Sequence, residues 1–179
     1  MQPGFDLRLR TMMKALSEVV LPAVDPANRA AVEQGSIVLG SLDLLLQQVD
    51  YAHWYEVVDL LSLCNLAREL SNIDGLDANP KIGDAVSIGV AIAARWDVSL
   101  SQIRQSNLAL RDAIGETAER AFTSDQVGVR TRVQALVLSH SEEQIGRERA
   151  YVAGTKWDIF PESLQTIEAS LARASTEID

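Results

Sequence analysis

The feature that most constrains this fold is a long stretch without positive charge in which apolar residues recur at helical spacing. No Lys or Arg occurs between Arg29 and Arg68. Within the stretch, Leu, Ile, Val and Ala return every three or four residues, which is typical of helices that pack against a core. The stretch therefore predicts one or two helices that are buried over most of their surface.

The first half of the stretch predicts an amphipathic helix from Pro26 to about Asp50. Asp25 followed by Pro26 is a start signal, because Asp caps helices and Pro fits the first helical position. At about 100° per residue, one side of this helix is small or apolar and the other is polar. The apolar stripe is Ala31, Gly35, Val38, Leu42, Leu45 and Val49, and the polar stripe is Glu33, Ser36, Gly40, Asp43, Gln47 and Asp50. We expect only a narrow polar ribbon to face water.

The helical pattern changes phase between Asp50 and His53. The later apolar positions are Trp54, Val57, Leu60, Leu61, Cys64, Ala67 and Leu70. Two interpretations remain open. One is a tight connection between two helices, capped by Asp50. The other is a single helix over residues 26–70, which would be roughly 65 Å long at 1.5 Å per residue and would indicate a partner chain along its length.

Further helices are predicted on both sides of this stretch. One covers Asp6–Val20, and residues 71–80 form a loop with an Asp-Gly turn. A helix over Pro80–Trp96 is apolar nearly all round, and its glycines Gly83 and Gly89 indicate close packing, because each costs about 1 kcal/mol of helix propensity. Ser99 and Gln102 can form a capping box. It opens a helix to about Phe122 with Ile103, Leu110, Ile114, Ala118 and Ala121 inward.

The C-terminal third is harder to interpret. Residues 127–137 fit either a helix or a strand, and we favour a helix because no second strand is available for pairing. The acidic start at Ser141 and the late Arg147 and Arg149 suit the macrodipole of a helix that ends near Gly154. Whether it continues the preceding helix stays open. Trp157, Ile159 and Phe160 are expected to dock on the bundle before a last helix from Pro161.

Length and composition favour one all-α domain over residues 1–179, a bundle of six to eight helices. The chain has 179 residues, of which 47% are hydrophobic and only 5% aromatic. A chain of this size buries enough surface to fold without disulfides or metal. Its core is therefore expected to be aliphatic, with helix packed on helix.

Charge and cysteine content restrict the partners and the compartment. The net charge is −9, from 16 basic and 25 acidic residues. We expect no nucleic-acid partner from this acidic chain, because its densest basic group is Arg8, Arg10 and Lys14 on one helix. Cys64 is the only cysteine, which suits a reducing compartment. No signal peptide or membrane span is visible, so we expect a cytoplasmic protein.

One polar row is the candidate binding site. Asp50, His53, Glu56 and Asp59 follow one another at intervals of three residues, which brings neighbouring members close on a helix surface. Binding by Asp50, His53 and Glu56 is the prediction, although the row turns away from any single point. No complete metal set and no cofactor motif occurs. His140 between Ser139 and Ser141 is expected to be structural, since adjacent helical residues diverge.

The segment from Leu21 to Leu70 resembles an uncharacterised group of all-helical bacterial proteins. In that group a Pro-Ala-x-Asp-Pro turn precedes a helix that contains Glu-Gln and a later glycine. The matching residues here are Pro22, Ala23, Asp25, Pro26, Glu33, Gln34 and Gly40. The resemblance implies a helical fold and no activity.

Two functions follow as expectations. The first is a non-enzymatic interaction protein that forms a homodimer, because two helices are apolar over nearly all their circumference. The alternative is a small-molecule or metal-binding site between helices near Asp50 to Glu56, an arrangement that would also suit an enzyme.

Overall fold

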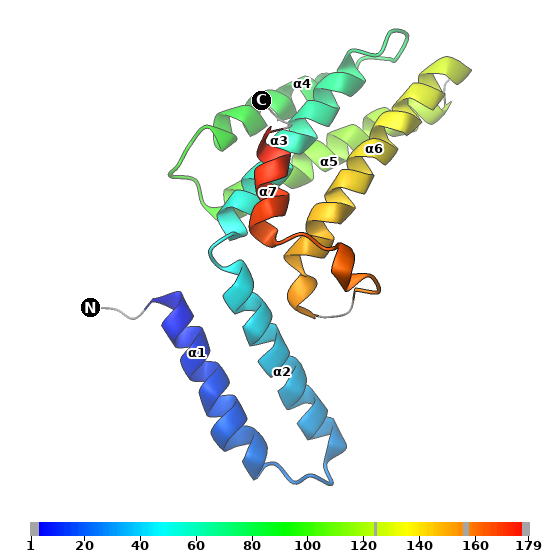
Figure 1. Cartoon of the computed structure of the whole chain (residues 1–179). Coiled ribbons are helices and arrows are strands. Elements are labelled where there is room, and N and C mark those ends of the chain that lie inside the picture. Colours follow the sequence, from blue (N-terminus) through cyan, green and yellow to red (C-terminus); the bar gives the residue numbers. More distant parts are fainter. Residues whose placement is uncertain (1–3, 124, 156–157, 177–179) are drawn as a thin grey trace. The chain divides into compact units, whose positions relative to one another are not determined.

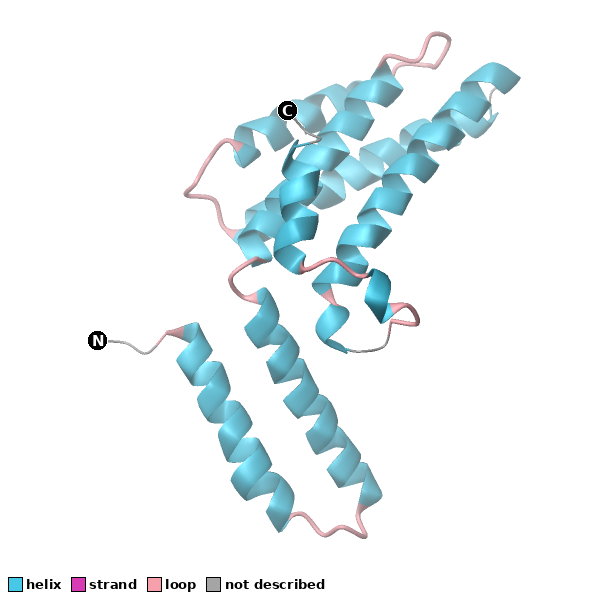
Figure 2. Cartoon of the chain, viewed as in Figure 1, coloured by secondary structure: helices cyan, strands magenta, loops and turns pink. Residues whose placement is uncertain are grey.

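The computed structural model describes residues 4–123, 125–155 and 158–176. Over these ranges every regular element is helical and no strand occurs (Figures 1 and 2). The all-α prediction is confirmed, and the 7 α-helices of the described residues fall within the expected number. None of the helices in these ranges is long and apolar enough to cross a membrane. The chain divides into two compact units, Met1–Tyr51 with Arg149–Leu164 and Ala52–Glu148 with Gln165–Asp179.

The first unit contains a hairpin of two helices. These are α1 (Phe5–Ala15), which continues as a π-helical turn over Leu16–Val20 and a 3-10 turn over Leu21–Ala23, and α2 (Arg29–Gln48). The two helices run antiparallel (Figure 1). The predicted start of the second helix is wrong by three residues. Asn28 caps it by accepting from Ala31 N at 3.2 Å, whereas Asp25 accepts from Ala27 N at 2.9 Å and closes the preceding turn.

The hairpin leaves its apolar residues only partly covered. Leu9 and Met13 of α1 and Leu16 of the π-helical turn are half-buried, and no residue of α1, α2 or the turns between them is fully buried. On α2 the half-buried stripe runs through Ala31, Gly35, Leu39, Leu42, Leu46 and Val49. The expectation that this helix is buried over most of its surface is wrong, because α2 packs along its length on α1 alone and meets the segment after α6 only near its C-terminal end.

The rest of the first unit is the segment Arg149–Leu164, which packs on the end of α2. Gln48 Nε2 donates to Tyr151 O at 2.8 Å. Arg149 forms two hydrogen bonds with the Asp158 carboxylate, at 2.7 and 2.8 Å. The docking prediction is wrong for Ile159 and Phe160, which are 82% and 56% exposed. Its third member, Trp157, lies outside the described residues.

The second unit holds the hydrophobic core. Its helices are α3 (Ala52–Ser71), α4 (Pro80–Ala93), α5 (Leu100–Thr123), α6 (Val127–Tyr151, of which the last three residues belong to the first unit) and α7 (Ile167–Thr176). Helices α3, α4 and α5 pack closely on one another, and α7 lies against α3. The fully buried side chains include Leu60, Cys64, Leu70, Ile103, Leu110 and Val133. The core is aliphatic, as expected.

The structure answers two questions that the sequence left open, the number of helices in residues 26–70 and the conformation of residues 127–137. Gln48 ends α2 and Ala52 begins α3, so residues 26–70 form two helices and not one. Residues 127–137 are helical, and the same helix runs on to Tyr151 without a break at Ser141. The last helix begins at Ile167 instead of Pro161, where only a 3-10 turn forms.

Helix α4 approaches α3 at one glycine. A Cβ at Gly89 would lie 2.8 Å from Cys64 Sγ and 3.3 Å from side-chain carbons of Leu60 and Leu110. The close-packing prediction is confirmed for Gly89 and wrong for Gly83, which has no neighbour within 4 Å of that position. The predicted capping box at the start of α5 is present, since Ser99 N donates to Gln102 Oε1 at 2.9 Å.

Candidate functional site

The predicted binding row is divided between the two units. Asp50 is exposed in the turn after α2, in the first unit, and His53 is exposed in the first turn of α3, in the second. Glu56 is half-buried. Its carboxylate accepts from Arg104 Nε at 2.6 Å and from Asn107 Nδ2 at 3.1 Å, so it ties α3 to α5. Among the described residues no group of three His, Cys, Asp or Glu could hold a metal. A binding role for Asp50, His53 and Glu56 stays a prediction.

The last member of the row, Asp59, lies at the centre of a buried polar cluster. Asp59 is only 5% exposed, and Arg111 Nη2 donates to its Oδ2 at 2.8 Å. A second guanidinium, that of Arg147, lies 3.8 Å from Oδ1 and is itself buried. A buried charge is costly unless it is paired. Helices α5 and α6 therefore each supply one cation to the same carboxylate of α3.

Ser62, one turn after Asp59, joins Arg147 to His140. Arg147 Nη2 donates to Ser62 Oγ at 3.3 Å, and His140 Nδ1 lies 3.4 Å from the same oxygen. Arg147 can only donate, and the Ser62 hydroxyl can then either donate to His140 Nδ1 or accept a second hydrogen bond from it. The contact at Nδ1 therefore fits both neutral tautomers of His140. His140 Nε2 is a buried nitrogen with no hydrogen-bond partner in the part of the chain that the structure describes.

The environment keeps His140 neutral and the nearby Tyr55 protonated. Burial, together with the positive charge of Arg147, lowers the pKa of His140 below its usual value. Burial, followed by the negative charge of Asp59, raises the pKa of Tyr55. Both shifts follow from loss of water around the ionised form. The cluster thus offers a neutral imidazole beside a buried guanidinium.

A cavity of about 230 Å³ borders this cluster. Ser62 and Arg147 line it, and both are buried, while Glu69 and Glu143 line it as exposed residues. The other lining residues are Asn65 and Leu66 of α3, Leu136, Ser139 and His140 of α6, and Ala174 of α7. The cavity therefore has buried hydrogen-bond donors on one part of its wall and solvated carboxylates on another.

Sequence reasoning missed most of this cluster. It assigned Arg147 to the macrodipole of α6, whereas the structure pairs this residue with Asp59 and Ser62. A signal was present on α3, because Asp59 and Ser62 are polar residues within a run of mostly apolar residues, and both are buried. The partners could not be read from the sequence, since they lie on α5 and α6.

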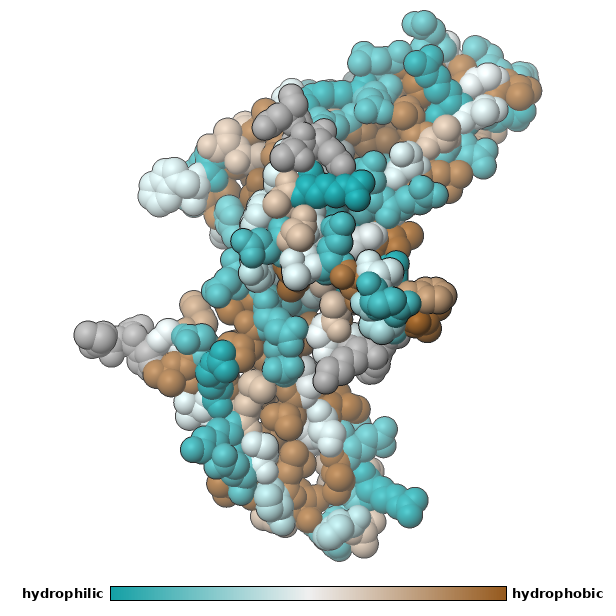
Figure 3. Space-filling model, viewed as in Figure 1, coloured by the Kyte–Doolittle hydropathy of each residue, from teal (hydrophilic) through white to brown (hydrophobic). Residues whose placement is uncertain are grey.

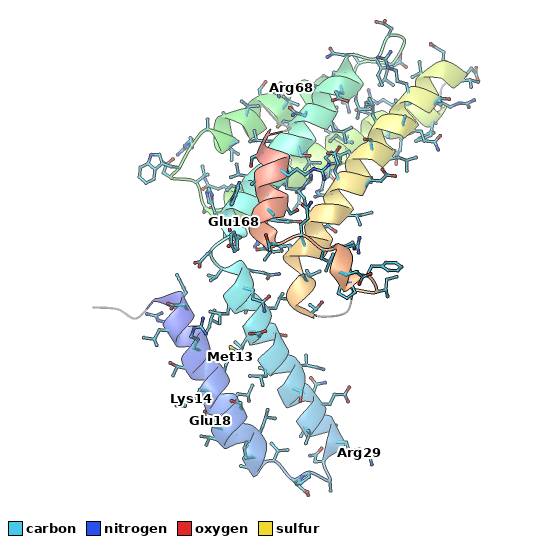
Figure 4. The ribbon with its side chains drawn as sticks, viewed as in Figure 1. Met13, Lys14, Glu18, Arg29, Arg68 and Glu168 are labelled. Atoms are coloured by element: carbon cyan, nitrogen blue, oxygen red, sulfur yellow. The ribbon has the colours of Figure 1, made fainter. Side chains whose placement is uncertain are left out.

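The hairpin of the first unit has two unlike flanks. One is a groove of about 720 Å³ in which polar and apolar residues alternate, lined by Met13 and Lys14 of α1, by Ser17 and Glu18 of the π-helical turn, and by Ser36, Leu39, Gly40 and Asp43 of α2. Lys14 and Glu18 follow one another along the first helix and its π-helical turn (Figure 4), and Lys14 Nζ lies 3.8 Å from Glu18 Oε2. This groove is the predicted polar ribbon of α2, extended by polar residues of α1.

The other flank of the hairpin is apolar and exposed. On α1 it carries Phe5 and Met12, which are seven residues apart and 72% and 48% exposed, and in the π-helical turn that follows it carries Val19, which is 67% exposed. On α2 it carries Val38 and Leu45, again seven apart, which are 49% and 51% exposed. Residues seven apart return to nearly the same side of a helix. Hydrophobic residues along the hairpin are brown in Figure 3. We call these five side chains the apolar flank.

Comparison with protein families, with curated proteins and with solved structures finds no match to this chain. The resemblance of residues 21–70 to an uncharacterised bacterial family stays a prediction. The function is therefore argued from the geometry alone.

Proposed function

We propose that the protein is a non-enzymatic interaction protein whose α1–α2 hairpin pairs with the hairpin of a second copy. The observation that carries this proposal is the apolar flank, which includes Met12, Val38 and Leu45 on a hairpin with no fully buried residue. Two amphipathic helices bury only one side of each other. A four-helix arrangement of two hairpins would cover the second side.

The size of the hairpin supports this pairing. Helix α2 has 20 residues, which makes it about 30 Å long, and two neighbouring helices are about 20 Å wide. The flank therefore offers roughly 600 Å², close to the roughly 800 Å² that each partner contributes to a stable interface. Apolar residues at intervals of seven are the pattern that packs helix on helix.

Charge supports an antiparallel arrangement of the two copies. Helix α1 carries Arg8, Arg10 and Lys14 against one acidic residue, Asp6. The closed end of the hairpin carries Glu18, Asp25 and Glu33 against one basic residue, Arg29. A two-fold axis across the hairpin would bring the basic part of each copy to the acidic end of the other. The same symmetry uses one surface twice, so that no flank stays open.

The proposal extends to the setting of the protein. We place it in the cytoplasm, because the single thiol, Cys64, is buried and unpaired and a protein without disulfides suits a reducing compartment. Nucleic acid is not among the proposed partners, since the net charge is −9 and phosphate binding needs clustered cations.

A matched pair of variants tests the dimer. Val38→Glu and Ser36→Glu add the same charge to α2, but two residues apart on a helix they point about 200° away from each other. Sedimentation velocity is measured at protein concentrations of about 1 to 50 µM, because dimer formation depends on concentration. We expect a dimer for the wild type and for Ser36→Glu, and a monomer for Val38→Glu. A monomeric wild type at the top of this range would overturn the proposal. So would a dimer of Val38→Glu that is as stable as the wild type.

A further inference from the structure

The cavity of the second unit is a separate candidate site. We propose that the cavity between α3 and α6 binds a small zwitterion, a molecule with a carboxylate at one end and an ammonium group at the other. Nothing in the proposed pairing of the hairpins requires this site. The inference is independent of it.

The buried part of the cavity wall is suited to a carboxylate. Arg147 is 6% exposed and donates to Ser62, and its contact with a carboxylate, that of Asp59, is long at 3.8 Å. The closer partner of Asp59 is Arg111, at 2.8 Å and with a side chain 39% exposed, so the buried positive charge of Arg147 has no close carboxylate partner. A carboxylate in the cavity would balance this charge and accept a charge-assisted hydrogen bond.

His140 supplies a second reason to expect a polar ligand there. Its Nε2 is a buried nitrogen without a hydrogen-bond partner among the described residues, and His140 lines the cavity. A buried polar atom left unpaired is costly, so most are paired in native structures. In the tautomer with its proton on Nε2, His140 would donate to a ligand oxygen and remove this cost.

The exposed part of the wall is suited to a cation. Glu69 of α3 and Glu143 of α6 line the cavity as exposed residues, and neither forms an ion pair within the described ranges. An ammonium group near the solvated side would lie close to these two carboxylates. Leu66 and Leu136, also in the lining, can contact a short methylene chain between the two charged ends.

The volume restricts the ligand to a small molecule. The cavity of about 230 Å³ is below the roughly 300 to 1,000 Å³ of sites for drug-sized ligands. A nucleotide or a peptide would not fit, whereas an amino acid with a short chain would.

The test uses the full-length protein and a series of simple probes. Glycine, 3-aminopropionate and 4-aminobutyrate carry both charges at increasing separation, propionate carries only the anion, and propylamine carries only the cation. We expect isothermal calorimetry to show that at least one zwitterion binds tenfold or more tightly than propionate and propylamine. The dependence on chain length would report the separation of the two subsites.

Variants at the cavity locate the binding. Glu143→Gln removes an exposed carboxylate of the lining, and its neighbour Glu142→Gln is the matched control, since Glu142 is exposed on the same helix and outside the lining. We expect Glu143→Gln to weaken the best zwitterion at least threefold and Glu142→Gln to leave it unchanged. His140→Phe removes the buried Nε2 and is expected to weaken the binding of the zwitterion and of propionate together.

Several results would overturn the proposal. One is the absence of binding by all three zwitterions at millimolar concentration, and another is propionate binding as tightly as the best of them. Equal affinity in the wild type, Glu143→Gln and His140→Phe would place any binding outside this cavity. If His140→Phe fails to fold, as judged by circular dichroism, the exposed pair Glu143→Gln and Glu142→Gln decides alone. None of these results depends on whether the protein is a dimer.

Discussion

The hairpin and the core of the second unit use the same kinds of residue and bury them very differently. Helix α2 and helix α3 have 20 residues each, yet α2 has no fully buried residue while α3 has nine, among them Leu60, Cys64 and Leu70. The difference is the number of neighbours, because α3 packs against α4, α5 and α7 while α2 packs on α1 and on the segment after α6. Apolar content thus sets what a helix can bury, and the neighbours set what it does bury.

The largest expected contrast is in the cost of removing a leucine. Leu110 is 0% exposed and Leu45 is 51% exposed. We expect Leu110→Ala to lower the free energy of unfolding by about 3 kcal/mol, because it leaves a cavity in a packed core. Leu45→Ala should cost less than about 1 kcal/mol, since its site is half in water. Urea unfolding followed by circular dichroism, at a concentration where the protein is monomeric, measures both. Equal costs would show that the hairpin is as well packed as the core.

A smaller effect, with opposite signs, is expected at two glycines of α4. A Cβ at Gly89 would meet Cys64 Sγ at 2.8 Å, whereas one at Gly83 has open space. Gly89→Ala should therefore destabilise the second unit by about 1 to 3 kcal/mol through overpacking. Gly83→Ala should stabilise it by about 0.5 to 1 kcal/mol, because Ala is the better helix former. Thermal unfolding of both variants checks the signs. A stabilising Gly89→Ala would mean that α3 and α4 are not in close contact there.

The smallest expected effect is a pH dependence confined to the second unit, which contains both histidines of the chain. The folded state lowers the pKa of His140, and the unfolded chain takes up this proton near pH 6.5. Between the two pKa values the unfolded state binds more protons. Stability is therefore lost as the pH falls below about 6.5, by at most about 1.4 kcal/mol per pH unit, and His140 adds no pH dependence above it.

Substitution of His140 separates this effect from the titration of carboxylates. We expect His140→Gln to lose less stability than the wild type between pH 7.5 and 5.5, and Ser139→Ala, one residue away, to behave like the wild type. Denaturant unfolding of the three proteins at the two pH values gives the six free energies that this comparison needs. An unchanged loss in His140→Gln would exclude His140 as its source.

Local features of the fold were predictable because they depend on residues close in sequence. The change of phase between Asp50 and His53 marks the end of α2 and the start of α3, and Ser99 with Gln102 forms the expected capping box. Such features rest on the helical repeat and on contacts within one turn. The predicted start of α2 was wrong because Asp25 and Asn28 can both cap a helix, and the backbone conformation decides between them.

The candidate site could not be predicted, because its members come from distant parts of the chain. Asp59, Arg111 and Arg147 lie on three helices, and no pattern in the sequence pairs a carboxylate with one arginine among many. The burial of α2 was overestimated for a related reason. The helical periodicity shows which residues can be buried, as with Val38 and Leu45. It does not show how many other helices pack over them.

The contact between Cys64 and Gly89 has a consequence for oxidative chemistry. Cys64 is 0% exposed, burial raises the pKa of its thiol, and its sulfur fills the space that a side chain at position 89 would need. Oxidation or alkylation requires a thiolate and room for added atoms, and the folded core provides neither. When a reagent such as iodoacetamide reacts faster than the second unit closes, the rate of Cys64 modification should therefore equal the rate at which the unit opens. When it reacts more slowly, the rate should be proportional to the fraction of time that the unit is open. Modification of Cys64 thus reports how often the core of the second unit opens to solvent.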